Sequence, residues 1–192
     1  MIARRKRLPR VHSFAPIADE NAEVLILGSM PGRASLAAGQ YYAHAQNAFW
    51  RILCELLRID PGSAYEARAQ ALKSARIALW DVLQSCTRAG SLDAAIERDT
   101  QIANDFRSFF DLHERIKCVC FNGATAEACF TRHVLPQIDE RSIRYVRLPS
   151  TSPAHAAMSF EQKLEAWREG LRHTGASRRL RLPAARVRRT DT

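Results

Sequence analysis

One short segment of this 192-residue chain, residues 40–50, combines groups that can hold a flat polar ring with groups that can hold water. Aromatic faces stack on nucleic-acid bases, and amide side chains read base edges or position a water molecule. The groups in question are Tyr41, Tyr42, His44, Gln46, Asn47, Phe49 and Trp50. An aromatic cluster at the start of a helix is also typical of a hydrophobic core, so the segment alone leaves both interpretations open.

The turn at residues 28–32, GSMPG, offers a second kind of chemistry, because its backbone N–H groups can bind an oxygen atom. It follows an apolar run at 24–27 whose length and partial β-branching predict a buried parallel strand. Two glycines and a proline cannot continue that strand, so they predict a tight turn. Backbone amides around Ser29, Met30 and Gly32 could bind a base carbonyl or a phosphate. The turn lacks the Lys-Ser/Thr pair of a phosphate-binding loop and the spacing of a dinucleotide fingerprint.

Polar residues also lie at the ends of the other predicted strands. Asp81 lies in the run 77–83, Asn122 follows the run 116–121, and a serine-rich turn at 149–153 follows the run 143–148. The carboxyl ends of parallel strands meet at one edge of a sheet, so we expect these groups to share a site with the glycine turn. There a carboxylate such as Asp81 could activate water, and an amide such as Asn47 could position it.

The elements that must position these residues alternate between strands and helices. Helices are expected from residue 47 to Pro61, at 63–74, at 100–113, at 124–133 and at 159–173, and loops at 33–46 and 85–93. The alternation predicts the α/β class, as a three-layer αβα sandwich with a four-stranded, mostly parallel central sheet. The chain length fits one domain, which we place at residues 14–175.

The charge of the chain favours a polyanionic partner, with nucleic acid as the first candidate. Lys and Arg number 29 against 20 Asp and Glu, a formal charge of +9. Many of these charges lie in the segments 1–13 and 176–192, which we expect to be a basic flexible arm and a basic disordered tail. A flexible arm of this kind can add non-specific affinity for phosphates.

The five cysteines form no C-x-x-C pair. Cys118 and Cys120 alternate with Val119 on a predicted strand, so they are expected to be small core residues. The odd count and the absence of a secretory signal favour reduced thiols in the cytoplasm. No run approaches the roughly 18 apolar residues that a membrane span needs. We expect no metal site, no cofactor and a monomer.

Taken together, the glycine turn and the downstream QYYAHAQNAFW resemble the first motif of the uracil-DNA glycosylase superfamily. The resemblance is strongest to the hypoxanthine-DNA (deoxyinosine) glycosylase branch. Mismatch-specific uracil glycosylases carry an asparagine inside the glycine turn, where this chain has Met30, which moves the suspected catalytic amide to Asn47. LPSTSP resembles the second motif, with Leu148 in the position of a histidine or asparagine. Some relatives hold an iron–sulfur cluster on four spaced cysteines, and because that spacing is missing we expect no cluster.

The resemblance implies a monofunctional DNA glycosylase that hydrolyses the N-glycosidic bond of a flipped-out deaminated base, with hypoxanthine first, in base excision repair. Its partner would be DNA containing deaminated bases. Asn47 would hold the water, and Asp81 is the competing catalyst. The expected base-binding residues are Gly28, Ser29, Met30, Gly32, Tyr42 and Asn122, and the expected DNA-binding residues are Ser150, Thr151, Ser152, Pro153 and His155.

Simpler structural roles and other functions remain open. Asn47 fits a helix N-cap, Tyr42 a core tyrosine, Asn122 a turn residue before Gly123, and His44 a loop histidine with local hydrogen bonds. The alternative functions are a uracil- or mismatch-directed glycosylase with the same residues and a non-catalytic nucleic-acid-binding protein of the same fold.

Overall fold

Four strands form a parallel sheet in the computed structural model, which describes residues 8–138, 142–172 and 174. The strands are β2 (Val24–Gly28), β3 (Ile77–Asp81), β6 (Cys118–Asn122) and β7 (Arg144–Leu148), in the spatial order β3-β2-β6-β7. β2 and β3 are buried at every position, as strands covered on both faces must be. The register pairs Gly28 with Asp81 and Asn122 with Leu148, so the strands end together at one edge.

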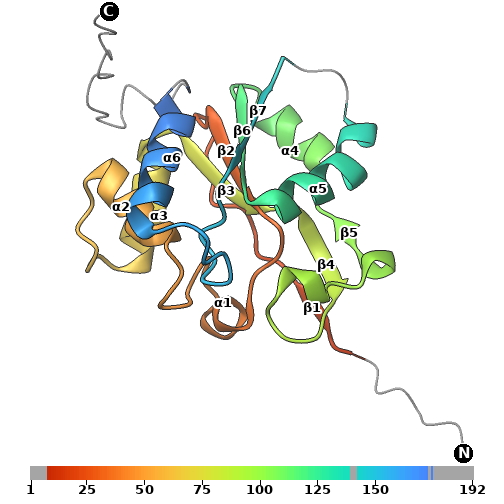
Figure 1. The fold of residues 1–192 in the computed structure, drawn as a ribbon. Coiled ribbons are helices and arrows are strands. Elements are labelled where there is room, and N and C mark those ends of the chain that lie inside the picture. Colours follow the sequence, from red (N-terminus) through yellow and green to blue (C-terminus); the bar gives the residue numbers. More distant parts are fainter. Residues whose placement is uncertain (1–7, 139–141, 173, 175–192) are drawn as a thin grey trace, which may run out of the picture.

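Helices cover both faces of this sheet (Figure 1). α2 (Phe49–Leu57), α3 (Tyr65–Ser74) and α6 (Phe160–Arg172) lie on one side, and α4 (Phe106–Leu112) and α5 (Ala124–His133) lie on the other. Short 3₁₀ helices, η1 (Asp93–Ala95), η2 (Arg98–Thr100) and η3 (Leu135–Gln137), lie in the connections. The predicted three-layer αβα sandwich with a four-stranded parallel sheet is confirmed.

A second sheet, antiparallel and made of three short strands, departs from the prediction. It contains β1 (Arg10–His12), β4 (Leu83–Thr87) and β5 (Ile102–Ala103) in the order β1-β4-β5. The predicted strand 77–83 ends at Asp81, and the chain then bends into β4. At this bend Val82 N donates to Gly28 O (2.9 Å) and Leu83 N donates to Ser29 O (3.1 Å), which ties the bend to the end of β2. Residues 85–87 of the predicted loop therefore belong to a strand.

The segment predicted as a basic arm contributes to this second sheet. Residues 10–12 form β1, the guanidinium of Arg10 donates to Ser85 Oγ (2.9 Å), and Ser13 N donates to Gln84 O (2.8 Å). The flexible arm predicted at 1–13 is thus ordered from at least β1 onward. Residues 1–7 and the predicted tail at 176–192 lie outside the described residues.

Three further boundaries differ from the prediction. The helix expected from residue 47 to Pro61 ends at Leu57, because Arg58 adopts a left-handed backbone conformation with a φ of +55°. The loop expected at 33–46 begins with a six-residue helix, α1 (Arg33–Ala38). The helix expected at 100–113 begins only at Phe106, because Asp105 caps it by accepting a hydrogen bond from Ser108 N (3.0 Å). The residues before this cap include β5.

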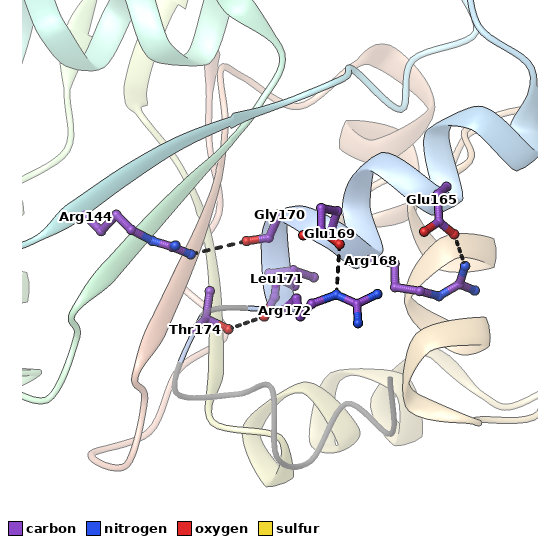
Figure 2. A network of polar contacts seen from close by, with 8 residues as sticks. All are labelled: Arg144, Glu165, Arg168, Glu169, Gly170, Leu171, Arg172 and Thr174. Carbon is purple, nitrogen blue, oxygen red and sulfur yellow. Dashed lines mark hydrogen bonds and ion pairs between the residues drawn. The ribbon is translucent and has the colours of Figure 1, made fainter. Parts of the chain in front are cut away.

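The C-terminal half of α6 is fixed against β7 (Figure 2). Gly170 permits close approach of the two elements, since a Cβ at this position would lie 2.3 Å from Leu148 Cδ2. Arg144 Nη2 donates to Gly170 O (3.4 Å), and Thr174 Oγ1 donates to Leu171 O (2.7 Å) just beyond the helix. Ion pairs within the helix join Arg168 to Glu165 and Arg172 to Glu169. These contacts fix the helix whose N-terminal half approaches the candidate site.

Candidate active site

A cavity of about 630 Å³ lies where the four parallel strands end. Its volume is in the range of small-molecule binding pockets. Its wall includes every residue that the sequence analysis assigned to catalysis, base binding or DNA binding: Gly28, Ser29, Met30, Gly32, Tyr42, Asn47, Asp81, Asn122, Ser150, Thr151, Ser152, Pro153 and His155. The fold therefore brings the glycine turn, the residue 47 amide and the serine-rich turn into one pocket, as the parallel topology predicts.

Gly28 is the point of closest approach at the floor of the cavity. A Cβ on this residue would lie 2.3 Å from Asp81 Oδ1 and 2.7 Å from the Tyr42 hydroxyl. Both distances are far below a normal contact, so the position requires glycine for space. The carboxyl of Asp81 and the hydroxyl of Tyr42 thus both lie beside Cα of Gly28.

Asp81 is a buried acid, with only 3% of its surface exposed. Its Oδ2 accepts a hydrogen bond from Ser13 Oγ (2.9 Å), and its backbone oxygen accepts one from Asn104 Nδ2 (2.8 Å). Burial raises the pKa of Asp81 to about 7, with a smaller contribution from the charge of Asp93, while the Ser13 hydroxyl and Arg88 oppose the shift. Near neutral pH this carboxyl can therefore either donate or accept a proton.

Tyr42 has an unusual backbone and an unsatisfied hydroxyl. Its φ is +54°, in the left-handed region that residues other than glycine seldom adopt. Its ring stacks on Phe49 with centroids 4.0 Å apart, so one face is covered and only the other could meet a base. The hydroxyl is buried without a hydrogen-bond partner in the described part of the chain. Burial, followed by the charge of Asp81, raises the pKa of this phenol, so it stays protonated and can donate.

Asn47 lines the cavity one residue before Ala48, the N-cap of α2, so the predicted N-cap is displaced by one residue. Its Oδ1 accepts a hydrogen bond from Phe49 N (2.9 Å), and the neighbouring Ala48 N donates to Thr151 O (3.0 Å). The hydrogen bond from Phe49 N fixes which way the amide faces, yet one lone pair of Oδ1 and the amide NH₂ remain for other partners. This turn before the helix and a role in holding water are therefore compatible.

Asn122 ties the end of β6 to the serine-rich turn. Its Nδ2 donates to Thr151 Oγ1 (2.9 Å), and its Oδ1 accepts from Thr151 N (2.9 Å). Next to it, Gly123 has a φ of +96°, and a Cβ there would lie 2.9 Å from Ser150 Cβ. The Asn122 amide thus has a clear structural function, with one N–H and one lone pair left to reach a base.

The turn at 149–155 is held from α6. Lys163, a lysine that is only 6% exposed, donates from Nζ to His155 O (2.8 Å) and to Ser152 O (3.4 Å). Trp167, one turn further along the helix, donates from Nε1 to Pro149 O (2.9 Å). Burial lowers the pKa of Lys163. Sequence reasoning missed both residues as supports of this turn, because they lie in an ordinary amphipathic helix pattern.

Part of the wall that the sequence did not predict comes from the loop at 88–96, through residues 91–94, and part comes from the start of α1, through residues 33–35. Asp93 Oδ1 accepts a hydrogen bond from Ser29 Oγ (2.8 Å), and Ser91 Oγ accepts one from Arg33 N (3.1 Å). Desolvation raises the pKa of Asp93, and its hydrogen bond with Ser29 opposes the shift. The signal in the sequence is Gly90-Ser91 soon after a strand, which indicates a loop but not its direction.

His44 also lines the cavity and, as expected, bonds locally: its Nδ1 accepts from Gln46 N (3.2 Å). Within the described ranges, no group of three or more His, Cys, Asp and Glu side chains is placed to hold a metal ion. No helix in the described part of the chain is long and apolar enough to span a bilayer. The five cysteines are free and buried.

Comparison with known proteins gives concordant matches. The family model described as the uracil DNA glycosylase superfamily matches residues 15–171. A hypoxanthine DNA glycosylase of Methanosarcina acetivorans is 35% identical over 161 residues, which is 83% of this chain and 97% of the relative. Another from Methanosarcina barkeri is 44% identical over 111 residues, which is 57% of this chain and 69% of the relative. A solution NMR structure from Methanosarcina acetivorans, described as a candidate uracil DNA glycosylase, superposes with a TM-score of 0.69 at 32% identity, covering 82% of this chain and 94% of that one.

Proposed function

The chain belongs to the uracil DNA glycosylase superfamily, and from this premise we propose that it is a DNA glycosylase that releases hypoxanthine from deoxyinosine in DNA. Two hypoxanthine DNA glycosylases are similar to it over more than half of its length. The observation that most supports the proposal is that Asn47, the glycine turn and residues 150–152 line one cavity. A pocket of this kind receives a base only after the nucleotide has left the helix.

The reaction is hydrolysis at the sugar. The C1′–N9 bond breaks with its electron pair going to the base, and the oxygen of water bonds to C1′. One proton of the water ends on the released base, and the other remains in the new hydroxyl of the abasic sugar. Positive charge develops on the sugar as the bond breaks, so the water needs to be held in place more than it needs a strong base.

Asn47 is the residue that we assign to the water. Its amide is a poor base, but its orientation is fixed by the hydrogen bond from Phe49 N, which leaves a lone pair of Oδ1 to accept from water. A fixed acceptor costs no reorganisation when the cation forms. Asp81 is the alternative, since a carboxylate activates water better than an amide does.

The floor of the cavity supplies the groups for base recognition. The Tyr42 hydroxyl is an unpaired donor, and the Asp81 carboxyl can donate or accept near neutral pH. The glycine turn lines the same space, and we assign its backbone amides to a base carbonyl or a phosphate. Hypoxanthine presents both ring acceptors and an N–H donor, which this mixed set could satisfy.

Leu148 takes no part in this recognition. It is buried against Gly170 of α6 and does not line the cavity. The resemblance places a histidine or asparagine at this position, where a donor would stabilise an anionic leaving base. The proposed enzyme therefore lacks a side-chain donor at this position for an anionic leaving base, and its reaction should depend less on such a base than the release of uracil does.

The test is base release from a duplex containing deoxyinosine, comparing wild type, Asn47→Ala and Asp81→Ala. We expect wild type to produce abasic sites and Asn47→Ala to lose most of that activity. Loss in Asp81→Ala with full activity in Asn47→Ala would reverse our assignment of the water. DNA binding without any abasic product would make the protein a non-catalytic binder.

Uracil is the second candidate base, because the solved relative is described as a uracil DNA glycosylase. A panel of otherwise identical duplexes with hypoxanthine, uracil, xanthine or an intact base separates the candidates. Faster release of uracil than of hypoxanthine would overturn the proposed preference.

A further inference from the structure

Asp93 places a second carboxyl in the wall of the cavity, on the loop at 88–96. Its Oδ1 accepts a hydrogen bond from Ser29 Oγ (2.8 Å), which ties the carboxyl to the glycine turn. Ser29 is only 7% exposed, so the carboxyl is held where the turn lines the cavity. The proposed reaction assigns the water to Asn47 or Asp81 and leaves Asp93 without a role.

The loop that carries Asp93 is anchored beneath the glycine turn. An antiparallel bridge pairs Arg88 with Ile96 at the base of the loop. The Arg88 side chain is only 2% exposed, and one of its terminal nitrogens donates to Pro31 O. At the tip, Leu92 is 60% exposed, whereas the next side chain, that of Asp93, bonds to the turn. The fold therefore sets the direction of the Asp93 carboxyl.

Two neighbours of Asp93 favour its ionised form. Desolvation raises the pKa of Asp93, while the Ser29 hydroxyl and the charge of Arg88 oppose the rise. An ionised carboxylate can only accept hydrogen bonds, and it has about four lone-pair sites, of which the bond from Ser29 uses one. The other sites can accept an N–H of a bound base, but they repel a ring nitrogen that carries a lone pair.

Deamination of adenine to hypoxanthine changes the edge of the base that pairs in a duplex, and enzymes read a flipped base through this edge. Adenine has a lone pair on N1 beside an amino group, whereas hypoxanthine has an N1–H donor beside a carbonyl oxygen. The wall offers the complement of the second pattern. The glycine turn has the backbone amides that we assign to a carbonyl, and Ser29 of the same turn holds an acceptor, the carboxylate of Asp93.

On the basis of the proposed glycosylase function, we infer that Asp93 accepts a hydrogen bond from N1–H of hypoxanthine and thereby excludes adenine. Asn122, the other polar side chain assigned to the base edge, is less suited, because both ends of its amide already bond to Thr151. The carboxylate separates hypoxanthine from adenine but not from guanine, which carries the same N1–H. It would accept the N3–H of uracil in the same way and repel the bare N3 of cytosine.

The experiment compares wild type, Asp93→Asn, Asp93→Ala and Asp99→Asn on duplexes that differ only in having hypoxanthine or adenine opposite thymine. Asparagine can keep its oxygen on Ser29 Oγ, which turns its NH₂ toward the base. We expect Asp93→Asn to lower kcat/KM for hypoxanthine by about 10- to 100-fold and to release adenine faster than wild type does. Asp93→Ala should lose a similar factor for hypoxanthine without the gain for adenine. Asp99 is the matched control, because it is exposed and does not line the cavity, and Asp99→Asn should equal wild type.

Binding is measured in parallel by fluorescence anisotropy, with single strands in which a 2′-fluoro group blocks cleavage of deoxyinosine or deoxyadenosine. Wild type should bind the deoxyinosine strand more tightly, and Asp93→Asn should lose or reverse this preference. An unchanged ratio between the two bases in Asp93→Asn, or an equal loss for both, would overturn the role of Asp93 in selecting the base. If wild type releases no base, the proposed function fails, and the ratio of the two binding constants still decides whether Asp93 reads the base.

Discussion

Replacing Asp81 by asparagine should remove a decrease in the free energy of unfolding that wild type shows as the pH rises. The carboxyl is 3% exposed, and its pKa rises from the ordinary value of 3.8 to about 7, mainly through burial. The folded state therefore holds a proton that the unfolded chain has already released between these two values. Stability is greatest below the unfolded pKa and is lost as the pH rises through the folded pKa.

The size of this loss in the free energy of unfolding follows from the two pH units between pH 5 and the pKa of Asp81 in the folded state, which is about 7. At about 1.36 kcal/mol for each unit, wild type should lose about 2.7 kcal/mol between pH 5 and pH 9 relative to Asp81→Asn. Asparagine can still accept the hydrogen bond from Ser13 Oγ, so the packing around the side chain is preserved. Groups that titrate elsewhere contribute equally to both proteins and cancel in the difference.

The assay is urea unfolding of wild type and Asp81→Asn at intervals from pH 5 to pH 9. The difference in the free energy of unfolding should grow with pH and level off above about pH 8. Ser13→Ala provides a second check, because the Ser13 hydroxyl lowers the pKa of Asp81 and its loss should move the transition to higher pH. A difference that stays flat over this range would show that Asp81 titrates near its ordinary value, and the argument from burial would be wrong.

Three further predictions concern the cavity. Gly28→Ala should reduce the rate of base release by about 100-fold, because the new Cβ displaces the carboxyl of Asp81 from its place in the cavity. Gly62→Ala is the control, since its Cβ would meet nothing closer than 3.5 Å, and its rate in the same assay should be unchanged. Asn122→Ala should destabilise the protein by about 1 to 3 kcal/mol in urea unfolding, since it removes both hydrogen bonds to the serine-rich turn, and a smaller effect would show that the turn holds its shape without them. Asp81→Asn should slow the release of hypoxanthine more than that of uracil at pH 6, and equal slowing would contradict a role for its proton.

The sheet and the membership of the cavity were predictable because both follow from apolar runs that end in polar residues. The runs before Gly28, Asp81 and Asn122 are short, buried and separated by helical segments, and parallel strands bring their ends together. β4 was not predictable in this way. Its sequence, LQSCT, is buried at Leu83, Ser85 and Cys86, and a buried serine that accepts from Arg10 has no hydrophobic signal.

The second sheet matters for the site because it sets where the loop at 88–96 begins. That loop returns to the glycine turn through hydrogen bonds to residues more than fifty positions away, such as Ser29 and Pro31. Neither the bonds nor the exposure of Leu92 can be inferred from local sequence, since Gly90-Ser91 after a strand predicts only a loop. Lys163 and Trp167, which hold the turn at 149–155, were not predictable for the same reason: their partners are backbone oxygens of a distant segment.

The charge of the cavity bears on which base it can release. Uracil leaves as an anion, and the nearby carboxyls of Asp81 and Asp93 would oppose that charge whenever they are ionised. Two positions at which the resemblance to the superfamily leads us to expect polar groups are apolar in this chain, Met30 in the turn and Leu148 against α6. A purine can instead leave after its ring has gained a proton, and a carboxyl whose pKa is about 7 is a suitable donor near neutral pH. The same burial that makes Asp81 costly to the fold therefore suits it to a leaving base that departs neutral, which favours hypoxanthine over uracil.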